Sequence, residues 1–401
     1  MTTVTRARRN AGTPQRRSLS AILWWSALTL AALAAWWTAG TPPTGGSGPS
    51  LGVGWPLAAA PVLIAVLGLL AVHQRRHERV PWPVLLAGAY LVCAAWTITL
   101  AATSGALSDR SRFGAGEAAP PLSGRLLAEL AGSGVDGVAA AVLVCLVGAV
   151  ATPLVAIAVR SLCGELTSRR LLPVLALAPY ALAGANVEAL ALALGAATLA
   201  TATVASDPDR PGPRRLLLAA ACGLLLGTAA LFGYAAVLLA AGVVCVFFVR
   251  RRPLLNVAAA ATFFVPLLLA RAIGLDWTAD LAGALRVDAA TGLGLLGSAL
   301  AAAVVLLVLG GPALAASLRS IRTTPGWPFL VAGAAVVFAG VVAGLVTDRV
   351  NPGSWLPGLP WLLMAATAPD RQGGPSIPTP VSVLAVGSAS AYAVALLSQA
   401  G

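Results

Sequence analysis

The residues of this sequence best suited to chemistry lie between long apolar runs. One polar segment holds Asp109, Arg110, Arg112 and Glu117. A carboxylate can take a proton from an attacking hydroxyl, and an arginine can bond through both arms of its guanidinium to phosphate oxygens. The segment therefore predicts a site for an anionic, lipid-linked substrate, with an ordinary solvated loop as the alternative.

Glu188 follows Asn186 at the only polar break in a long apolar run. A charged side chain near the centre of a membrane costs about 2.5–3.5 kcal/mol on insertion scales, so such residues usually serve a function. We expect Glu188 at the outer tip of a helical hairpin, where Asn186 could form a hydrogen bond with Glu188 or with a ligand. The alternative is a polar tip that reaches the lipid headgroups.

Two further polar segments carry candidate binding residues. Asp276 and Trp277 combine a carboxylate with an indole, a usual pairing at sugar sites, and Arg349 is a candidate phosphate clamp. The same residue types would also anchor any loop at a membrane interface.

The composition determines which elements must position these residues. Of 401 residues, 58% are hydrophobic and 10% charged, with a mean hydropathy of +0.87. Folding this sequence around a soluble core would leave too little polar surface to cover it. A soluble globular enzyme is excluded, and we predict an all-α polytopic transmembrane helix bundle.

Apolar runs of about 20 residues match the length of a membrane crossing. Two runs, 171–205 and 216–249, are too long for one crossing, so we expect tight hairpins that turn at Gly184-Ala185-Asn186 and near Gly233-Tyr234. With the single spans, these give about thirteen crossings. The single spans are 20–39, 54–72, 82–102, 137–159, 254–272, 291–309, 327–346, 355–368 and 379–398.

The net charge of +12 is an orientation signal under the positive-inside rule, and not a nucleic-acid footprint. All 26 basic residues are arginine, and most fall on one side of the predicted topology, while most acidic residues fall on the other. We expect a multi-pass plasma-membrane protein with a cytoplasmic N-terminus and an extracytoplasmic C-terminus. We also expect residues 1–18 to form a disordered basic tail, and 19–401 to form one transmembrane domain with outer loops 103–136 and 273–290.

No cofactor or metal site is predicted. The five cysteines lack paired metal-ligand spacing, and the chain has only two histidines. The GxGxxG pattern at 292–297 lies in an apolar span and not after a strand, so it does not predict a dinucleotide site. It is better explained by close helix packing, as are the GxxxG pairs Gly223/Gly227 and Gly340/Gly344.

Several motifs, mostly apolar and therefore of low specificity, resemble those of the GT-C superfamily of integral-membrane glycosyltransferases, most closely its predicted actinobacterial members. The resemblance covers roughly residues 20–370. It rests on Leu171-Leu172-Pro173 through Pro179-Tyr180, Asn186-Val187-Glu188-Ala189-Leu190, Arg214-Arg215, Ala221-Cys222-Gly223-Leu224-Leu225-Leu226-Gly227, Leu231-Phe232-Gly233-Tyr234 and Trp355-Leu356-Pro357-Gly358-Leu359-Pro360-Trp361.

The resemblance implies a GT-C-like fold and transfer of a sugar from a polyprenyl-phosphate donor to a cell-envelope glycan acceptor on the outer face. Asp109 or Glu117 would be the general base, Arg110, Arg112 and Arg349 would lie near phosphate, and Glu188 would shape the site. Ala119-Pro120-Pro121-Leu122 replaces a His-Pro-Pro-Gly-like turn, and only Asp348-Arg349 remains of an acidic and basic cluster. These departures leave a diverged or inactive relative as an alternative.

Two other functional classes stay open. A non-catalytic membrane scaffold, or a subunit bound to a membrane-protein partner, would keep the same architecture. A transporter is the least favoured class, because the sequence shows neither paired mid-membrane charges nor an internal repeat. Membrane lipid is an expected partner in every case, and nucleic acid is not.

Overall fold

The structure is a computed structural model that describes residues 80–103, 122, 125, 137–176, 188–284, 324–346 and 357–364. All regular elements in these ranges are helical, which confirms the all-α prediction. The elements are α4 (Trp82–Thr103), α6 (Gly137–Ala149), α7 (Ala151–Cys163), α8 (Glu165–Ala176), α9 (Glu188–Ala205), α10 (Gly212–Phe232), the 3₁₀ helix η3 (Tyr234–Leu238), α11 (Leu239–Val249), α12 (Leu254–Ala272), α13 (Trp277–Ala284), α15 (Trp327–Val346) and α16 (Leu359–Leu363).

Four helical segments are long and apolar enough to cross a membrane: Val138–Cys163, Glu188–Ala205, Gly212–Phe232 and Leu254–Ala272. The first spans both α6 and α7, because Val150 between them keeps helical dihedrals (φ −60°, ψ −23°). With the apolar composition, these helices identify a membrane protein.

Most of the predicted spans that can be compared coincide with helices. The predicted spans 82–102, 254–272 and 327–346 match α4, α12 and α15, and the hairpin predicted over 216–249 turns at Gly233 as expected. Within the predicted span 355–368, the described residues 357–364 hold only the five-residue α16, which is buried. The spans 20–39, 54–72, 291–309 and 379–398 and the turn at 184–186 lie outside the described residues, so the number of crossings stays a prediction.

Glycines allow α10 and α12 to pack in close contact. A Cβ on Gly223 would lie 2.0 Å from the Ala259 carbonyl oxygen, and one on Gly227 would lie 2.2 Å from that of Phe263. Gly227 follows Gly223 by four residues, and Phe263 follows Ala259 by four residues. Since both contacts advance in the same chain direction, α10 and α12 run parallel. The hydroxyl of Thr262 adds a hydrogen bond of 2.7 Å to the Ala220 carbonyl across this contact. The prediction that Gly223 and Gly227 serve close packing is confirmed.

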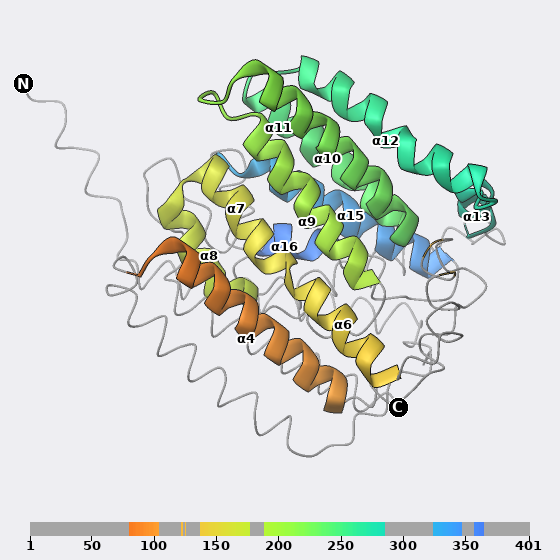
Figure 1. The fold of residues 1–401 in the computed structure, drawn as a ribbon, viewed down its shortest axis with the longest axis horizontal. Helices are drawn as coiled ribbons and strands as arrows, with labels where there is room; N and C mark the ends of the chain where they lie inside the picture. The colour runs from red at the N-terminus through yellow and green to blue at the C-terminus, as the bar shows by residue number, and fades with distance from the viewer. Residues whose placement is uncertain are drawn as a thin grey trace, which may run out of the picture.

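The core lies where α7, α9, α11, α15 and α16 meet. Trp361 of α16 and Phe329 of α15 are fully buried and stack with ring centroids 5.0 Å apart. Small residues fill the space around α9, where alanine is the commonest side chain and most positions are buried. Figure 1 shows α9, α10 and α12 side by side, with α4 and α6 on the opposite side.

The bundle has two chemically different ends among the described residues. The ends of α7, α9 and α11 and the starts of α8, α10 and α12 share one end, which carries most of the described arginines: Arg160, Arg169, Arg170, Arg210, Arg214, Arg215, Arg250, Arg251 and Arg252. The start of α9, the end of α12 and the short α13 share the other end, which carries Glu188, Asp276, Asp280 and Arg271. We name these the arginine end and the acidic end. Which side of the membrane each one faces stays a prediction.

Candidate functional site

Glu188 begins α9 at the acidic end and is 7% exposed, so it is buried in the protein and not a tip that reaches outward. The helix around it packs tightly: a Cβ on Gly148 would lie 2.8 Å from that of Ala189, and one on Gly233 would lie 3.0 Å from that of Ala191. A carboxylate in the first turn of a helix faces free backbone N–H groups and the positive end of the helix dipole. The fold therefore places the first turn of α9, with the buried Glu188, between the end of α6 and the turn after α10.

Asp276 caps the short helix α13 at the same end of the bundle. Its Oδ1 accepts hydrogen bonds from the Thr278 hydroxyl at 2.6 Å, the Thr278 amide at 3.1 Å and the Ala279 amide at 3.3 Å. These bonds favour the ionised form, so the Thr278 hydroxyl first, and then the backbone amides, hold the pKa of Asp276 below its ordinary value. Asp276 is thus ionised at neutral pH and already engaged in bonds within its own turn.

Trp277 ties α13 to the end of α10. Its indole N–H donates to the Ala230 carbonyl at 2.9 Å, and its ring meets that of Tyr234 at a centroid distance of 6.1 Å and an interplanar angle of 54°. Tyr234 follows directly after the turn at Gly233, next to α9. The indole ring remains partly exposed while its single polar atom is used internally.

The structure therefore brings three of the predicted site residues, Glu188, Asp276 and Trp277, to one end of the bundle. Tyr234 was not predicted as part of the site, since the sequence marked Gly233-Tyr234 only as a turn. An aromatic residue directly after the turn of an outward hairpin is the signal that could have found it. The other predicted site residues, Asp109, Arg110, Arg112, Glu117, Asn186 and Arg349, lie outside the described residues.

The loop 103–136, which holds four of those other residues, is attached to the acidic side of the bundle. Helix α4 ends at Thr103 and α6 begins at Gly137 on this side of the bundle, so the loop 103–136 is attached there at both ends (Figure 1). Helix α15 begins near Cys163 at the arginine end, where a Cβ on Gly326 would lie 3.1 Å from that sulfur, and runs to Val346. Arg349 follows three residues after that helix.

The arginine end holds a different cluster, built around Glu165. Its carboxylate oxygens pair with Nη2 of Arg160 and Nη2 of Arg169, each at 2.7 Å, and Nε of Arg169 adds a hydrogen bond of 2.9 Å. Nη1 of Arg169 also donates to the Val80 carbonyl at 2.9 Å, and the Arg160 guanidinium lies 4.7 Å from the centre of the Trp82 ring. These contacts fix the start of α4 against α7 and α8.

No group of three or more His, Cys, Asp or Glu residues in the described ranges could hold a metal ion. All five cysteines are free thiols, and Cys93, Cys145 and Cys222 are buried. Among the described residues, the acidic end offers carboxylates, aromatic rings and the guanidinium of Arg271.

No protein-family model and no curated protein matches the sequence. Among solved structures, the chain is similar to ArnT from Cupriavidus metallidurans bound to undecaprenyl phosphate, with 17% identity and a TM-score of 0.46. The match covers 71% of this chain and 59% of that one, so it spans about three fifths of the ArnT chain.

Proposed function

We propose that this protein is an integral-membrane glycosyltransferase that moves a sugar from a polyprenyl-phosphate donor to a cell-envelope acceptor at the acidic end of the bundle. The observation that carries the proposal is the buried carboxylate of Glu188, held at the start of α9 on the end where the Trp277 segment docks. A carboxylate is costly to bury, so a buried one inside a helix bundle is a functional candidate.

The proposed roles follow from the chemistry of each side chain. Asp109 or Glu117, on the loop between α4 and α6, acts as general base and takes the proton of the acceptor hydroxyl as it attacks the sugar carbon. Arg110, Arg112 and Arg349 bind the donor phosphate, whose charge grows as the glycosidic bond breaks. The lipid phosphate leaves, and the acceptor oxygen takes its place on the sugar.

Glu188, with Asn186 beside it in the chain, positions sugar hydroxyls in this proposal. The exposed face of Trp277 gives the sugar a stacking surface, because its indole N–H is already bonded to Ala230 and only the ring remains available. Asp276 acts indirectly by capping α13 and so holding Trp277 in place.

The test is turnover of a radiolabelled polyprenyl-phosphate sugar by the purified full-length protein in lipid nanodiscs, with envelope glycan as acceptor. Asp109→Asn and Glu117→Gln each remove one candidate base, and loss of the true base lowers kcat by about 10²–10⁴-fold. Glu188→Gln raises KM for the sugar donor more than it lowers kcat. Glu165→Gln is the matched control, since it removes a carboxylate at the opposite end and leaves turnover unchanged.

A scaffold or partner subunit is the second candidate, and one observation favours it. The polar atom of Trp277 and the Oδ1 of Asp276 are both used in bonds within the protein, as they would be in a loop that only closes the end of a bundle. Turnover that is absent in the wild-type protein with every lipid-phosphate sugar tried, together with stable co-purification of one membrane partner, would establish this function instead.

A further inference from the structure

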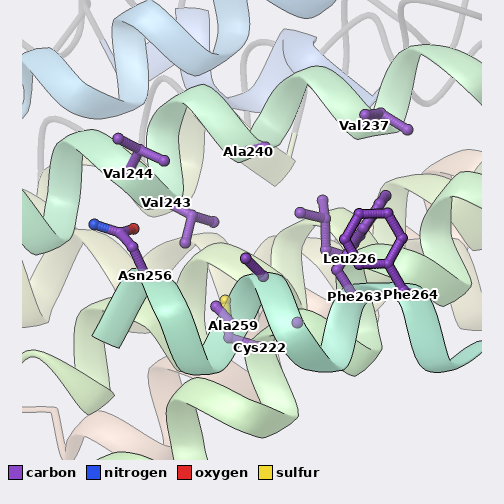
Figure 2. A pocket seen from close by; sticks show the side chains of 12 residues that line it. Cys222, Leu226, Val237, Ala240, Val243, Val244, Asn256, Ala259, Phe263 and Phe264 are labelled. Atoms are coloured by element: carbon purple, nitrogen blue, oxygen red, sulfur yellow. The ribbon is translucent and has the colours of Figure 1, made fainter. Parts of the chain in front are cut away.

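An apolar groove runs between α11 and α12, with α10 as its floor. Figure 2 shows it from close by, with Asn256 at one end and Phe263 and Phe264 at the other. Its cavity volume is about 180 Å³, and its lining is almost entirely apolar. From Asn256 to Phe264 it follows α12 for about 12 Å, at 1.5 Å per residue.

The groove exists because α12 is held against α10 and not against α11. The close contacts at Gly223 and Gly227 fix α12 on one side, while α11 packs on α15 and α9. The groove opens on the outer surface of the bundle, where Val244 is 40% exposed and Phe264 is 55% exposed. In a membrane this surface faces lipid tails, so the groove offers one hydrocarbon chain more contacts than a flat helix face.

A polar group lies inside the groove at its end. Oδ1 of Asn256 is buried and has no hydrogen-bond partner in the part of the chain that the structure describes. A buried amide oxygen without a partner is costly. Figure 2 shows the Asn256 side chain directed between α11 and α12, toward Val244. A ligand that places a donor there would satisfy it.

Exposed arginines surround this same end of the groove. Arg251 and Arg252 are exposed in the tight turn between α11 and α12, and Arg214 is exposed at the start of α10. Because Gly223 lies level with Ala259, the parallel register places Arg215 and its neighbour Arg214 level with that turn. Arg251 has a φ of 55°, a left-handed conformation that closes the turn. The groove is therefore an apolar channel with a cationic rim at the end where Asn256 lies.

We propose that this groove binds one anionic phospholipid, with an acyl chain along α12 and the phosphate at Arg251 and Arg252. The Asn256 amide lies beside the polar region of the lipid, where its N–H donates to an ester carbonyl and its Oδ1 accepts a hydrogen bond from a hydroxyl of the phosphatidylglycerol headgroup. Basic pockets between transmembrane helices are typical sites for anionic headgroups. The site lies at the opposite end of the bundle from the proposed glycosyl transfer and does not depend on it.

The test uses full-length protein in nanodiscs with equal amounts of phosphatidylglycerol and phosphatidylcholine, followed by native mass spectrometry of the retained lipid. We expect selective retention of one phosphatidylglycerol by the wild-type protein. Ala260→Phe fills the groove and abolishes this retention. Ala261→Phe is the matched control, because Ala261 is the next residue, is exposed and does not line the groove.

The charged rim is tested separately. Arg251→Asn keeps a residue that tolerates the left-handed conformation, and together with Arg252→Gln it removes both phosphate contacts. We expect selectivity for phosphatidylglycerol to fall about fivefold for each arginine removed. Arg271→Gln, at the other end of α12, leaves the selectivity unchanged.

A folding readout accompanies both sets of variants. Phosphatidylglycerol raises the Tm of the wild-type and control proteins in detergent, since it binds the folded state, and raises that of Ala260→Phe much less. Equal retention by Ala260→Phe and Ala261→Phe, or equal retention of the two lipids by the wild-type protein, would overturn the proposal. In nanodiscs that also contain undecaprenyl phosphate, its preferential retention over phosphatidylglycerol would overturn the choice of lipid.

Discussion

The indole N–H of Trp277 donates to the backbone carbonyl of Ala230 across 2.9 Å, and this bond joins the short helix α13 to the end of α10. Ala230 lies in the last turn of its helix, where backbone carbonyls lack partners within the helix. The tryptophan supplies one of the missing donors, so a residue predicted to stack on sugar also has a structural role.

Replacement of Trp277 separates these two roles. Trp277→Phe keeps an aromatic ring and loses the bond to Ala230, which costs about 1 kcal/mol of stability. We expect faster hydrogen exchange at the amide of Asp280, which donates to the Asp276 carbonyl at 3.0 Å in the first turn of α13. If the ring also stacks on sugar, Trp277→Phe retains turnover that Trp277→Ala loses. Unchanged exchange in Trp277→Phe would show that the bond does not hold α13.

Asp276 provides a second test of the same segment. Asp276→Ala removes the acceptor for the Thr278 and Ala279 amides, so both amides should exchange several-fold faster. Asp276→Asn is the control, because an asparagine oxygen caps a helix nearly as well. The hydrogen bonds lower the pKa of Asp276 in the folded protein, so the cap is complete above the ordinary value of 3.8 and weakens as the pH falls through the folded pKa. Equal exchange in both variants would contradict the cap.

The contact between α10 and α12 predicts a sharp difference between two glycines. Gly223→Ala places a Cβ against the Ala259 backbone, which must shift, and we expect a loss of about 1–3 kcal/mol. Gly88→Ala in α4 meets nothing within 4 Å and gains up to about 1 kcal/mol from better helix propensity. Thermal unfolding in detergent measures both changes. Similar Tm values for the two variants would show that α12 is not fixed on α10 through this site.

The helices were predictable because each one needs an apolar run of fixed length. The predicted spans 254–272 and 327–346 coincide with α12 and α15, and proline or glycine marks several boundaries, as Pro253 does before α12 and Gly233 does after α10. The hairpin at Gly233 followed from length alone, since a run of that size exceeds one membrane thickness.

The candidate site was predictable only in part, because side-chain burial depends on contacts between distant segments. The sequence singled out Glu188 but left open whether it reached outward, and its burial follows from packing of α9 against α6 and α10. The bond from Trp277 to Ala230 joins residues 47 positions apart, and no local pattern encodes it. The groove along α12 depends in the same way on how two helices diverge.

The cluster around Glu165 gives a pH-dependent prediction at the arginine end. The hydrogen bond from Arg169 first, with the charges of Arg160 and Arg169, holds the pKa of Glu165 below its ordinary value of 4.5. A folded-state pKa below the unfolded value means that the carboxylate stabilises the protein above pH 4.5, and that this contribution is lost as the pH falls through the folded pKa. We therefore expect Glu165→Gln to lower the Tm at pH 7. At a pH below the folded-state pKa of Glu165, the wild-type carboxyl is protonated and the two proteins should have nearly the same Tm.

Salt distinguishes this ion-pair cluster from a packing effect. The Glu165 pairs are partly exposed, so 1 M salt should narrow the Tm difference between wild type and Glu165→Gln at pH 7. The bond from Arg169 to the Val80 carbonyl remains in the variant, so the start of α4 should keep its protection from hydrogen exchange. A Tm difference that persists unchanged at low pH and in high salt would show that Glu165 acts by packing and not by charge.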